Sequence, residues 1–540
     1  MDAKEIPARP SLEQYKKQAK DLVKGFKSGD PDPLLRVRKS HPHPGKLLDS
    51  DVLKARFTLA DAQVVIAREH GFESWPKFAK HVVALAHRSS TTSDPMSDFL
   101  EAASAPLEAQ SSGTLERAQE ILAAHPEIAT RSIYAAAVLG DAHCVQRLLT
   151  LDARNATAKG GPRGWDALTY LCFSRYLRLD RTRSDGFVRA ASALLDAGAS
   201  AKTGYFDQAH RPEPEFESAL YGAAGVAHHA QLTQLLIERG ADPNDAEVPY
   251  HVPETYDNGV LKILVESGKL NADSLTTLLL RKHDWHDYDG IKWLLEHGAD
   301  PNRMTRWHRA SIHQAVLRDN SIEIIELLLE HGADPTLVAD DRSAVAMAAR
   351  RGRGDLLDLF ERRGVPLELH GVDDLLAACA RNDGKAVQLI ATREPQLVRE
   401  VLAEGGKLLA EFAGVGNTDG VRHLLDLGVS VDARSRDGDG YWNLTKDSTA
   451  LHVAAWRARH ATVRFLIERH APVDATDAKG QTPLALAVRA CVNSYWSNRR
   501  SPESVRALLS AGASVKGVDF PSGYAEVDGL LRQYAENTGS

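Results

Sequence analysis

The segment HDWHDYDG, residues 283–290, concentrates side chains that can hold a metal ion. Imidazole and carboxylate groups together ligate zinc, iron or manganese. Their spacing here matches no strong metal motif, and Asp289 is placed to cap a helix that would begin at Gly290. We therefore predict no metal site and no cofactor, and we keep His283, His286 and Asp287 as the candidate metal ligands.

Aromatic, histidine and arginine residues gather in a few segments, although aromatic residues make up only 6% of the chain. Tyrosine, tryptophan and arginine dominate the hot spots of protein interfaces. One interpretation is that these side chains bind a partner, and the other is that they fold each segment back against its own scaffold. The predicted partner-binding residues are Tyr205, Phe206, Tyr250, His251, Tyr256, Trp307, His308, Tyr441 and Trp442.

No catalytic signature accompanies these residues. The sequence has no nucleophile elbow, phosphate-binding loop, dinucleotide fingerprint or zinc-hydrolase helix, so it offers no ground for naming an enzyme. The four cysteines lie far apart, which indicates a reducing compartment. The first residues lack a signal peptide, and no apolar run approaches the roughly 18 residues of a membrane span. These features predict a cytoplasmic protein without a membrane segment.

A repeated unit must position the segments that are rich in aromatic, histidine and arginine residues. The sequence GADPN starts at Gly240 and at Gly298, GADP starts at Gly332, and each follows an amphipathic stretch. A second marker, a Ser or Thr before a run rich in alanine, opens at Thr449 as TALHVAA and at Thr482 as TPLALA. The hydroxyl suits a helix cap, and the glycine suits a left-handed residue after a helix.

These markers resemble the ankyrin repeat, a unit of about 33 residues. The resemblance implies a β-turn followed by two antiparallel helices in each unit, and hence an all-α solenoid. It also implies that His313 and His452 hydrogen-bond the turn. We expect about ten units, several degenerate, with a shortened one between Gly240 and Gly298 and a capping helix over 521–537.

Segments inserted into the units are where function is expected, because insertions map to loops on defined faces. Three would separate the two helices of their units, and three would lengthen β-turn fingers. The helix-separating insertions are 174–186, 283–290 and 491–503, and the finger insertions are 203–217, 246–258 and 435–447.

Residues 1–88 lack the repeat and predict a helical domain, joined by a linker over 89–97 to the solenoid over 98–540. Helices are expected from Ser11 to Gly29, over 57–71 and from Ser74 to about His87. The first has an apolar stripe at helical spacing. Residues 1–88 as a whole resemble an N-terminal helical module found ahead of many bacterial ankyrin-repeat proteins. The resemblance implies a bacterial source but no activity. The stripe comprises Leu12, Tyr15, Ala19, Leu22 and Phe26.

Charge is unevenly distributed along the 540 residues. The first 90 hold 17 Lys and Arg against 11 Asp and Glu, whereas the remainder holds 49 against 62. An acidic array argues against general nucleic-acid binding.

Two functions fit the array, and a third possibility is a phosphate-binding N-terminal head that uses Lys16, Lys17, Lys20, Lys24 and Lys27. The first is a scaffold that binds a partner protein on the concave face and finger loops of the solenoid. The alternative is an enzyme or a small-molecule or metal binder, with its site formed by 246–258 and 283–290 and lined by His251, His283, His286 and Asp287. The partner and the oligomeric state stay open.

Overall fold

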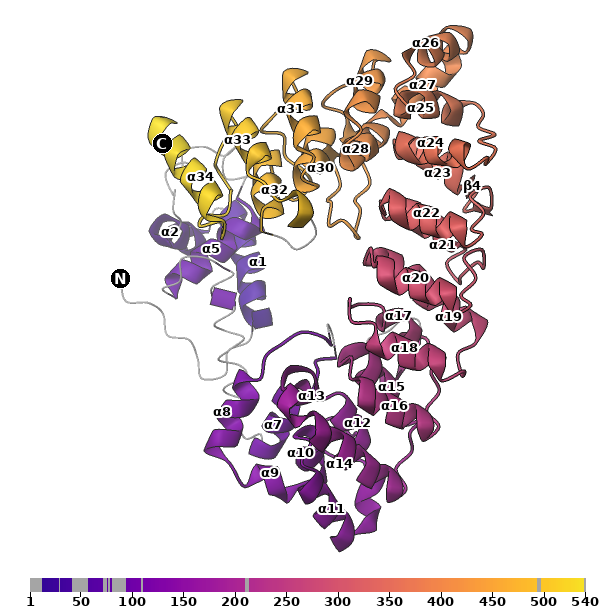
Figure 1. The fold of residues 1–540 in the computed structure, drawn as a ribbon. Helices are drawn as coiled ribbons and strands as arrows, with labels where there is room; N and C mark the ends of the chain where they lie inside the picture. The colour runs from indigo at the N-terminus through magenta and orange to yellow at the C-terminus, as the bar shows by residue number, and fades with distance from the viewer. Residues whose placement is uncertain are drawn as a thin grey trace. The chain divides into compact units, whose positions relative to one another are not determined.

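A computed structural model describes residues 12–28, 30–40, 57–70, 75, 78–79, 94–107, 110–208, 213–492 and 497–538 (Figure 1). The chain packs as two compact units, residues 1–214 and 215–540. Helices dominate both units, and the six named strands have two to four residues each. Among the described helices, none is both long and apolar enough to cross a membrane.

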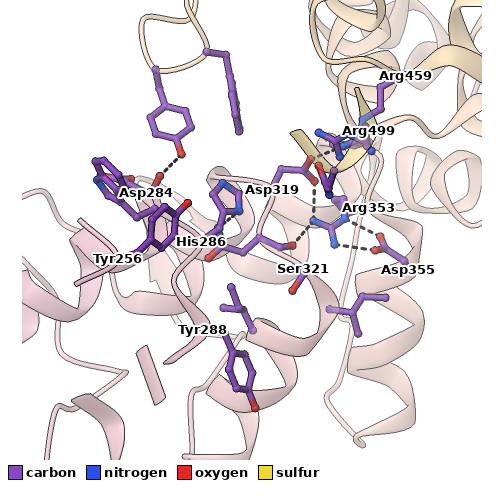
Figure 2. A pocket seen from close by; sticks show the side chains of 18 residues that line it. Tyr256, Asp284, His286, Tyr288, Asp319, Ser321, Arg353, Asp355, Arg459 and Arg499 are labelled. Atoms are coloured by element: carbon purple, nitrogen blue, oxygen red, sulfur yellow. Dashed lines mark hydrogen bonds and ion pairs between the residues drawn. The ribbon is translucent and has the colours of Figure 1, made fainter. Parts of the chain in front are cut away.

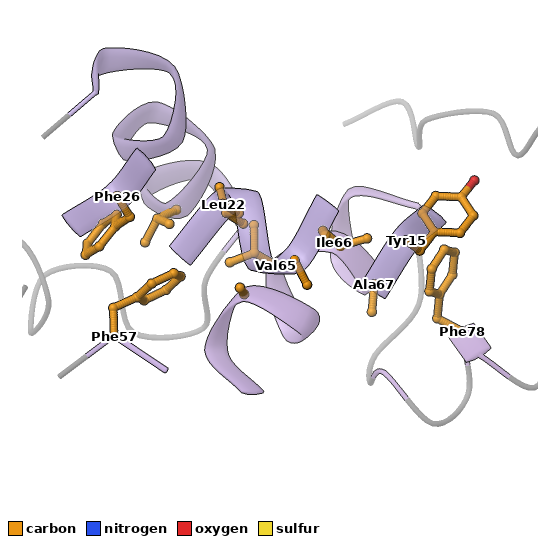
Figure 3. Packing of buried hydrophobic residues seen from close by; sticks show 11 residues of the cluster. Tyr15, Leu22, Phe26, Phe57, Val65, Ile66, Ala67 and Phe78 are labelled. Carbon is orange, nitrogen blue, oxygen red and sulfur yellow. The ribbon is translucent and has the colours of Figure 1, made fainter. Parts of the chain in front are cut away.

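The first helices of unit 1 pack around a small apolar core (Figure 3). The predicted helices are present as α1 (Leu12–Ser28) and α5 (Leu59–Glu69), and α2 (Pro31–Ser40) was not predicted. The predicted stripe is buried at Tyr15, Ala19, Leu22 and Phe26, while the side chain of Leu12 and most of the expected third helix lie outside the described residues. Phe26 packs against Phe57 with ring centroids 4.3 Å apart.

The rest of unit 1 consists of short paired helices. Helix α7 starts at Pro95, so the last residues of the predicted linker are helical. The insertion over 174–186 contains α13 and η2. The elements are α7 (Pro95–Ala103), α8 (Glu116–Ala124), α9 (Ile128–Arg131), α10 (Ile133–Val138), α11 (Ala142–Leu151), η1 (Ala153–Ala156), α12 (Ala167–Cys172), α13 (Arg175–Leu179), η2 (Arg181–Arg183), α14 (Ser184–Asp196) and β1 (Gly204–Asp207).

Unit 2 opens with β2 (Glu215–Ser218) and continues through successive helix pairs to α34 (Ala525–Thr538), the predicted capping helix. Its earlier elements are α15 (Ala219–Tyr221), η3 (Gly222–Val226), α16 (Ala230–Glu238), α17 (Glu247–His251), α18 (Gly259–Glu266), α19 (Ala272–Asp284), α20 (Tyr288–Glu296), α21 (Ser311–Leu317), α22 (Ile322–Glu330), β3 (Val338–Ala339), β4 (Arg342–Ser343), α23 (Ala344–Arg350) and α24 (Gly354–Arg362). The later ones are α25 (Val372–Ala380), α26 (Gly384–Arg393), α27 (Pro395–Ala403), α28 (Gly405–Val415), α29 (Thr418–Asp426), β5 (Arg434–Ser435), β6 (Ser448–Thr449), α30 (Ala450–Trp456), α31 (His460–Glu468), α32 (Pro483–Ala490), η4 (Ser497–Arg499) and α33 (Glu503–Ser510).

Each helix pair stacks on the next, as the repeat predicts. The first helices α19, α21 and α23 pack on one another in order, and so do α28, α30 and α32. Ser343 and Thr482 accept a backbone N–H at the starts of α23 and α32. Gly298 and Gly332 take positive φ after the second helices, where a residue without a Cβ avoids strain.

His452 has the role that the resemblance implies. Its Nδ1 accepts the backbone N–H of Thr449 at 3.2 Å, and its Nε2 lies 3.1 Å from the carbonyl oxygen of Gln481 in the next unit. The histidine therefore closes the first turn of α30 and links two neighbouring units.

The stack of unit 2 changes direction at α25–α27 (Figure 1). Helix α28 packs directly on α23, and α25 packs on α29. The Asn417 side-chain amide donates to the carbonyl oxygens of Gly352 and Ala380, both at 2.7 Å. A Cβ on Gly352 would lie 2.6 Å from the ring of Phe412, so this close approach needs glycine. The turns before the bend consequently face those after it.

Two local predictions were wrong. Residues 246–258 do not form a β-turn finger; they contain α17, which packs on α19 as the first helix of the shortened unit. The cap of α20 is Asp287 rather than Asp289, because the Asp287 carboxylate accepts the backbone N–H of Gly290 at 3.0 Å.

Candidate functional site

Turns between the paired helices of unit 2 enclose a cavity of about 860 Å³, here called the junction cavity (Figure 2). Three of the turns precede the bend, namely α19–α20, α21–α22 and α23–α24. Later turns contribute Val415, Arg459 and Arg499, and the loop between β5 and β6 contributes Tyr441 and Trp442. The bend therefore brings into one cavity residues as far apart in the sequence as Tyr256 and Arg499.

Asp319 is the centre of the polar wall. Its carboxylate accepts from Arg353 at 2.9 Å, from Arg457 at 2.6 Å and from Arg459 at 2.7 Å. Arg353 also pairs with Asp355 at 2.8 Å. Burial opposes ionisation of Asp319, but the three arginines outweigh it and lower the pKa of this carboxyl. The wall is thus a network in which guanidinium groups outnumber carboxylates.

Burial removes the arginines of the polar wall from water. The Arg457 side chain is only 2% exposed. Burial lowers the pKa of both Arg457 and Arg459 to about 10, in spite of the attraction of Asp319. Guanidinium groups stay protonated at neutral pH, so the charge persists within the wall.

Asp319 occupies a strained backbone position. Its φ is +54°, in the turn between α21 and α22; the corresponding turns have glycine at Gly140, Gly352 and Gly416, and a non-glycine residue at His228, His286, Asn382 and Ala458. A non-glycine residue in the left-handed region is disfavoured by roughly 1–2 kcal/mol. The contacts of the Asp319 carboxylate with three arginines hold the residue in this conformation.

The opposite side of the cavity carries aromatic rings. Tyr441 donates its hydroxyl to the carbonyl oxygen of Asp284 at 2.6 Å, across 157 residues of sequence. The Arg318 guanidinium lies 3.8 Å from the centre of the Tyr441 ring and donates to the Asp284 carboxylate at 2.6 Å. Trp442 is 4% exposed and packs with Trp456. The β5–β6 loop is therefore fixed to both sides of the bend.

A chain of contacts extends from this wall over neighbouring helices. The Arg281 guanidinium pairs with Asp284 and Glu254 and lies 4.0 Å from the centre of the Tyr250 ring. Tyr250 in turn contacts Trp307, with centroids 5.7 Å apart. The partly or fully exposed residues among these contacts and beside them form what we call the aromatic–arginine surface. It consists of Tyr250, Tyr256, Arg281, Trp285, Trp307 and Arg318.

Three predicted partner-binding residues, Tyr250, Tyr256 and Trp307, belong to this surface, and Tyr256 is 67% exposed. His308 is exposed beside Trp307. His251 lies under Tyr250, where burial would lower its pKa but hydrogen bonds to Glu247 and Glu254 raise it to about 9.

The remaining predicted residues are placed differently. Tyr441 and Trp442 both line the junction cavity, and the buried Trp442 also packs against Trp456. In unit 1, Phe206 is 60% exposed, but Tyr205 is 9% exposed and stacks on Trp165 with centroids 4.4 Å apart. Tyr205 and Trp442, both predicted to bind a partner, are thus largely covered by neighbouring side chains.

The candidate metal ligands do not converge. His283 is fully buried, with Nδ1 2.9 Å from the Asn320 side-chain oxygen and Nε2 2.7 Å from the Ser311 hydroxyl, and burial lowers its pKa to about 4. Asp287 pairs with the buried Lys282 at 2.7 Å. His286 is exposed at the cavity. Within the described residues, no group of three or more His, Cys, Asp or Glu side chains is arranged to hold a metal ion.

Sequence reasoning missed the polar wall of Asp319, Arg353, Arg457 and Arg459. The aspartate in the inter-helix turn is no signal, because His286, Asn382 and Ala458 also stand where Gly352 and Gly416 provide the positive φ. Nothing in the spacing of Arg457 and Arg459 shows that they meet Asp319, because their contacts with it depend on the bend.

The four cysteines are buried thiols. Burial raises the pKa of Cys172, that of Cys379 to about 12 and that of Cys491 to about 11. A thiol with a raised pKa is a poor nucleophile at neutral pH.

Family models for ankyrin repeats match residues 279–329 and 409–519. A segment of 85 residues is 40% identical to serine/threonine-protein kinase 12 of Arabidopsis thaliana. The matched segment makes up 16% of this chain and 17% of that protein, so the chain spans under a fifth of this curated relative.

Solved ankyrin repeat domains also align with the chain. The domain of human ASB11 is 21% identical and that of Bcl-3 is 19% identical, each covering 43% of this chain and 96% of its own, with a TM-score of 0.20. Together with the helix pairs described above, the family matches identify an all-α ankyrin solenoid. The predicted bacterial source and the resemblance of residues 1–88 stay predictions.

Proposed function

We propose that this ankyrin-repeat protein binds a partner protein through the aromatic–arginine surface of unit 2. Ankyrin stacks present extended surfaces on which partners dock. The ankyrin repeats matched over 279–329 include part of the aromatic–arginine surface. The observation that carries the proposal is Tyr256, a large aromatic side chain that is 67% exposed beside Trp285, with ring centroids 5.5 Å apart. The further proposed contacts in unit 2 are His308 and Tyr441, and Phe206 of unit 1 stays a separate prediction.

The arginines of this surface are held in place before any partner arrives. Arg281 and Arg318 are 14% and 18% exposed, and both pair with the Asp284 carboxylate. A fixed guanidinium loses less conformational freedom on binding than a mobile one. Rigid aromatic and arginine side chains are the residue types that contribute most to protein interfaces.

Binding measurements with two matched variants test the proposal. The partner is captured from a lysate of the source cells, purified, and titrated against wild type, Tyr256→Ala and Leu389→Ala. Leu389 lies on α26, away from the surface, and is 53% exposed. We expect Tyr256→Ala to weaken binding by about 2 kcal/mol, as for a hot-spot residue, and Leu389→Ala to leave it unchanged. Equal affinities for all three proteins would exclude this surface as the contact.

We also propose that the protein is cytoplasmic. The support is the four buried free cysteines, which suit a reducing compartment.

A further inference from the structure

The two walls of the junction cavity differ in chemistry: the guanidinium wall lies outside the proposed protein-binding surface, whereas Tyr256 and Trp285 of the aromatic wall belong to both. Figure 2 shows Arg353, Arg459 and Arg499 gathered about Asp319 on one side, with Tyr256 on the other. The volume of about 860 Å³ lies within the range of roughly 300–1,000 Å³ typical of sites for small molecules. A ligand that fills the cavity meets guanidinium groups at one end and aromatic faces at the other.

The guanidinium wall attracts an anion. The cluster of Arg353, Arg457, Arg459, Asp319 and Asp355 holds three positive groups and two carboxylates. Arg459 is the cation with donor capacity towards the cavity: its Nε donates to the carbonyl oxygen of Gly414 and its Nη2 to Asp319, which leaves Nη1 available within the described residues. Arg499 adds a second guanidinium from a different turn.

The aromatic side chains of the opposite wall favour a ligand whose non-ionic part is flat and apolar. Tyr256, Trp285, Tyr288 and Tyr441 line the cavity with Ile322. Flat apolar groups stack on such rings, whereas a bare inorganic ion gains nothing from them. A phosphate monoester carries close to two negative charges and three oxygens that can accept hydrogen bonds from more than one guanidinium.

We propose that the junction cavity binds a small aromatic phosphate monoester, with its phosphate on Arg459 and Arg499 and its ring against Tyr256 and the neighbouring aromatic side chains. This site shares Tyr256 and Trp285 with the proposed protein-binding surface, but its guanidinium wall lies outside that surface, so it does not require the proposed protein partner. The ligand also compensates the buried positive charge around Asp319, so its binding stabilises the folded protein.

Calorimetric titration of the full-length protein tests the proposal, with phenyl phosphate, inorganic phosphate and phenol as probes at constant ionic strength. We expect phenyl phosphate to bind one molecule per chain, at least tenfold more tightly than either inorganic phosphate or phenol. Arg499→Gln should weaken phenyl phosphate binding at least tenfold. The matched control Arg500→Gln, a change at the exposed neighbouring residue, should leave it within twofold.

A second variant separates the two walls. Tyr256→Ala should weaken binding of phenyl phosphate and leave that of inorganic phosphate unchanged. The proposal is overturned if phenyl phosphate does not bind at millimolar concentration, if it binds no better than inorganic phosphate, or if Arg499→Gln and Arg500→Gln behave alike. Tyr256→Ala that affects a protein partner but not phenyl phosphate also overturns it, and leaves the proposed protein-binding function standing.

Discussion

The Arg457 guanidinium donates to the Asp319 carboxylate at 2.6 Å, although 138 residues separate them. In a regular solenoid each unit contacts only its neighbours, so a pair this far apart in sequence requires the stack to bend. The same carboxylate accepts from Arg353 before the bend and from Arg459 after it. Asp319 therefore joins the two arms of unit 2 and shapes the cavity between them.

Asn417 should be needed for the bend. Asn417→Asp keeps the oxygen that caps α29 through Gly420 but removes the donors to the carbonyl oxygens of Gly352 and Ala380. Leaving buried carbonyl groups without donors should lower the free energy of unfolding by about 2 kcal/mol, measured by urea denaturation. If Asn417→Asp is as stable as wild type, these two hydrogen bonds do not hold the bend.

His251 should make the protein less stable at alkaline pH. Its folded pKa of about 9 exceeds the value of about 6.5 expected in the unfolded chain, so its contribution is complete below that lower value and disappears as pH rises through the folded pKa. Because the side chain is 25% exposed, solvent screening weakens its ion pairs. We therefore expect its contribution to the free energy of unfolding to be about 2 kcal/mol.

The measurement compares wild type with His251→Gln by urea denaturation at pH 6 and pH 9.5. We expect the stability advantage of wild type to shrink at the higher pH. An advantage that stays constant or grows would contradict the assignment of the ion pairs with Glu247 and Glu254.

The β5–β6 loop should depend more on Trp442 than on Tyr441. Tyr441→Phe removes one hydrogen bond, to the Asp284 carbonyl oxygen, and should reduce the free energy of unfolding by about 1 kcal/mol. Trp442→Ala removes a buried indole that packs with Trp456, and should reduce it by about 3–5 kcal/mol. Denaturation curves of the two variants give the comparison; a smaller loss for Trp442→Ala would show that the indole is not part of the core.

The repeat made much of the fold predictable, because local signals specify each unit. Glycine after the second helix, a hydroxyl before the first and the turn histidine at His452 all act within one or two units. The same reasoning failed over 246–258, where no strong periodicity separates the short helix α17 from a loop.

The candidate site was only partly predictable. The sequence singled out Tyr256, His286 and Tyr441 by residue type and by their place in insertions, and all three line the junction cavity. It gave no indication of the arginines around Asp319, since their convergence depends on packing of α28 against α23, a contact between units that are not consecutive. Short-range patterns do not encode such a contact.

The most direct test of the bent stack is a double-mutant cycle on Asp319→Asn and Arg457→Gln, with unfolding free energies from urea denaturation. Removing either partner of this buried pair should reduce stability by about 3–5 kcal/mol. The loss of stability in the double variant should be smaller than the sum of the two single losses by at least about 1.5 kcal/mol. The reason is that the second change removes a charge that has already lost its partner. Losses that add to within about 0.3 kcal/mol would mean that the two residues do not meet, and would contradict the bend and the cavity with it.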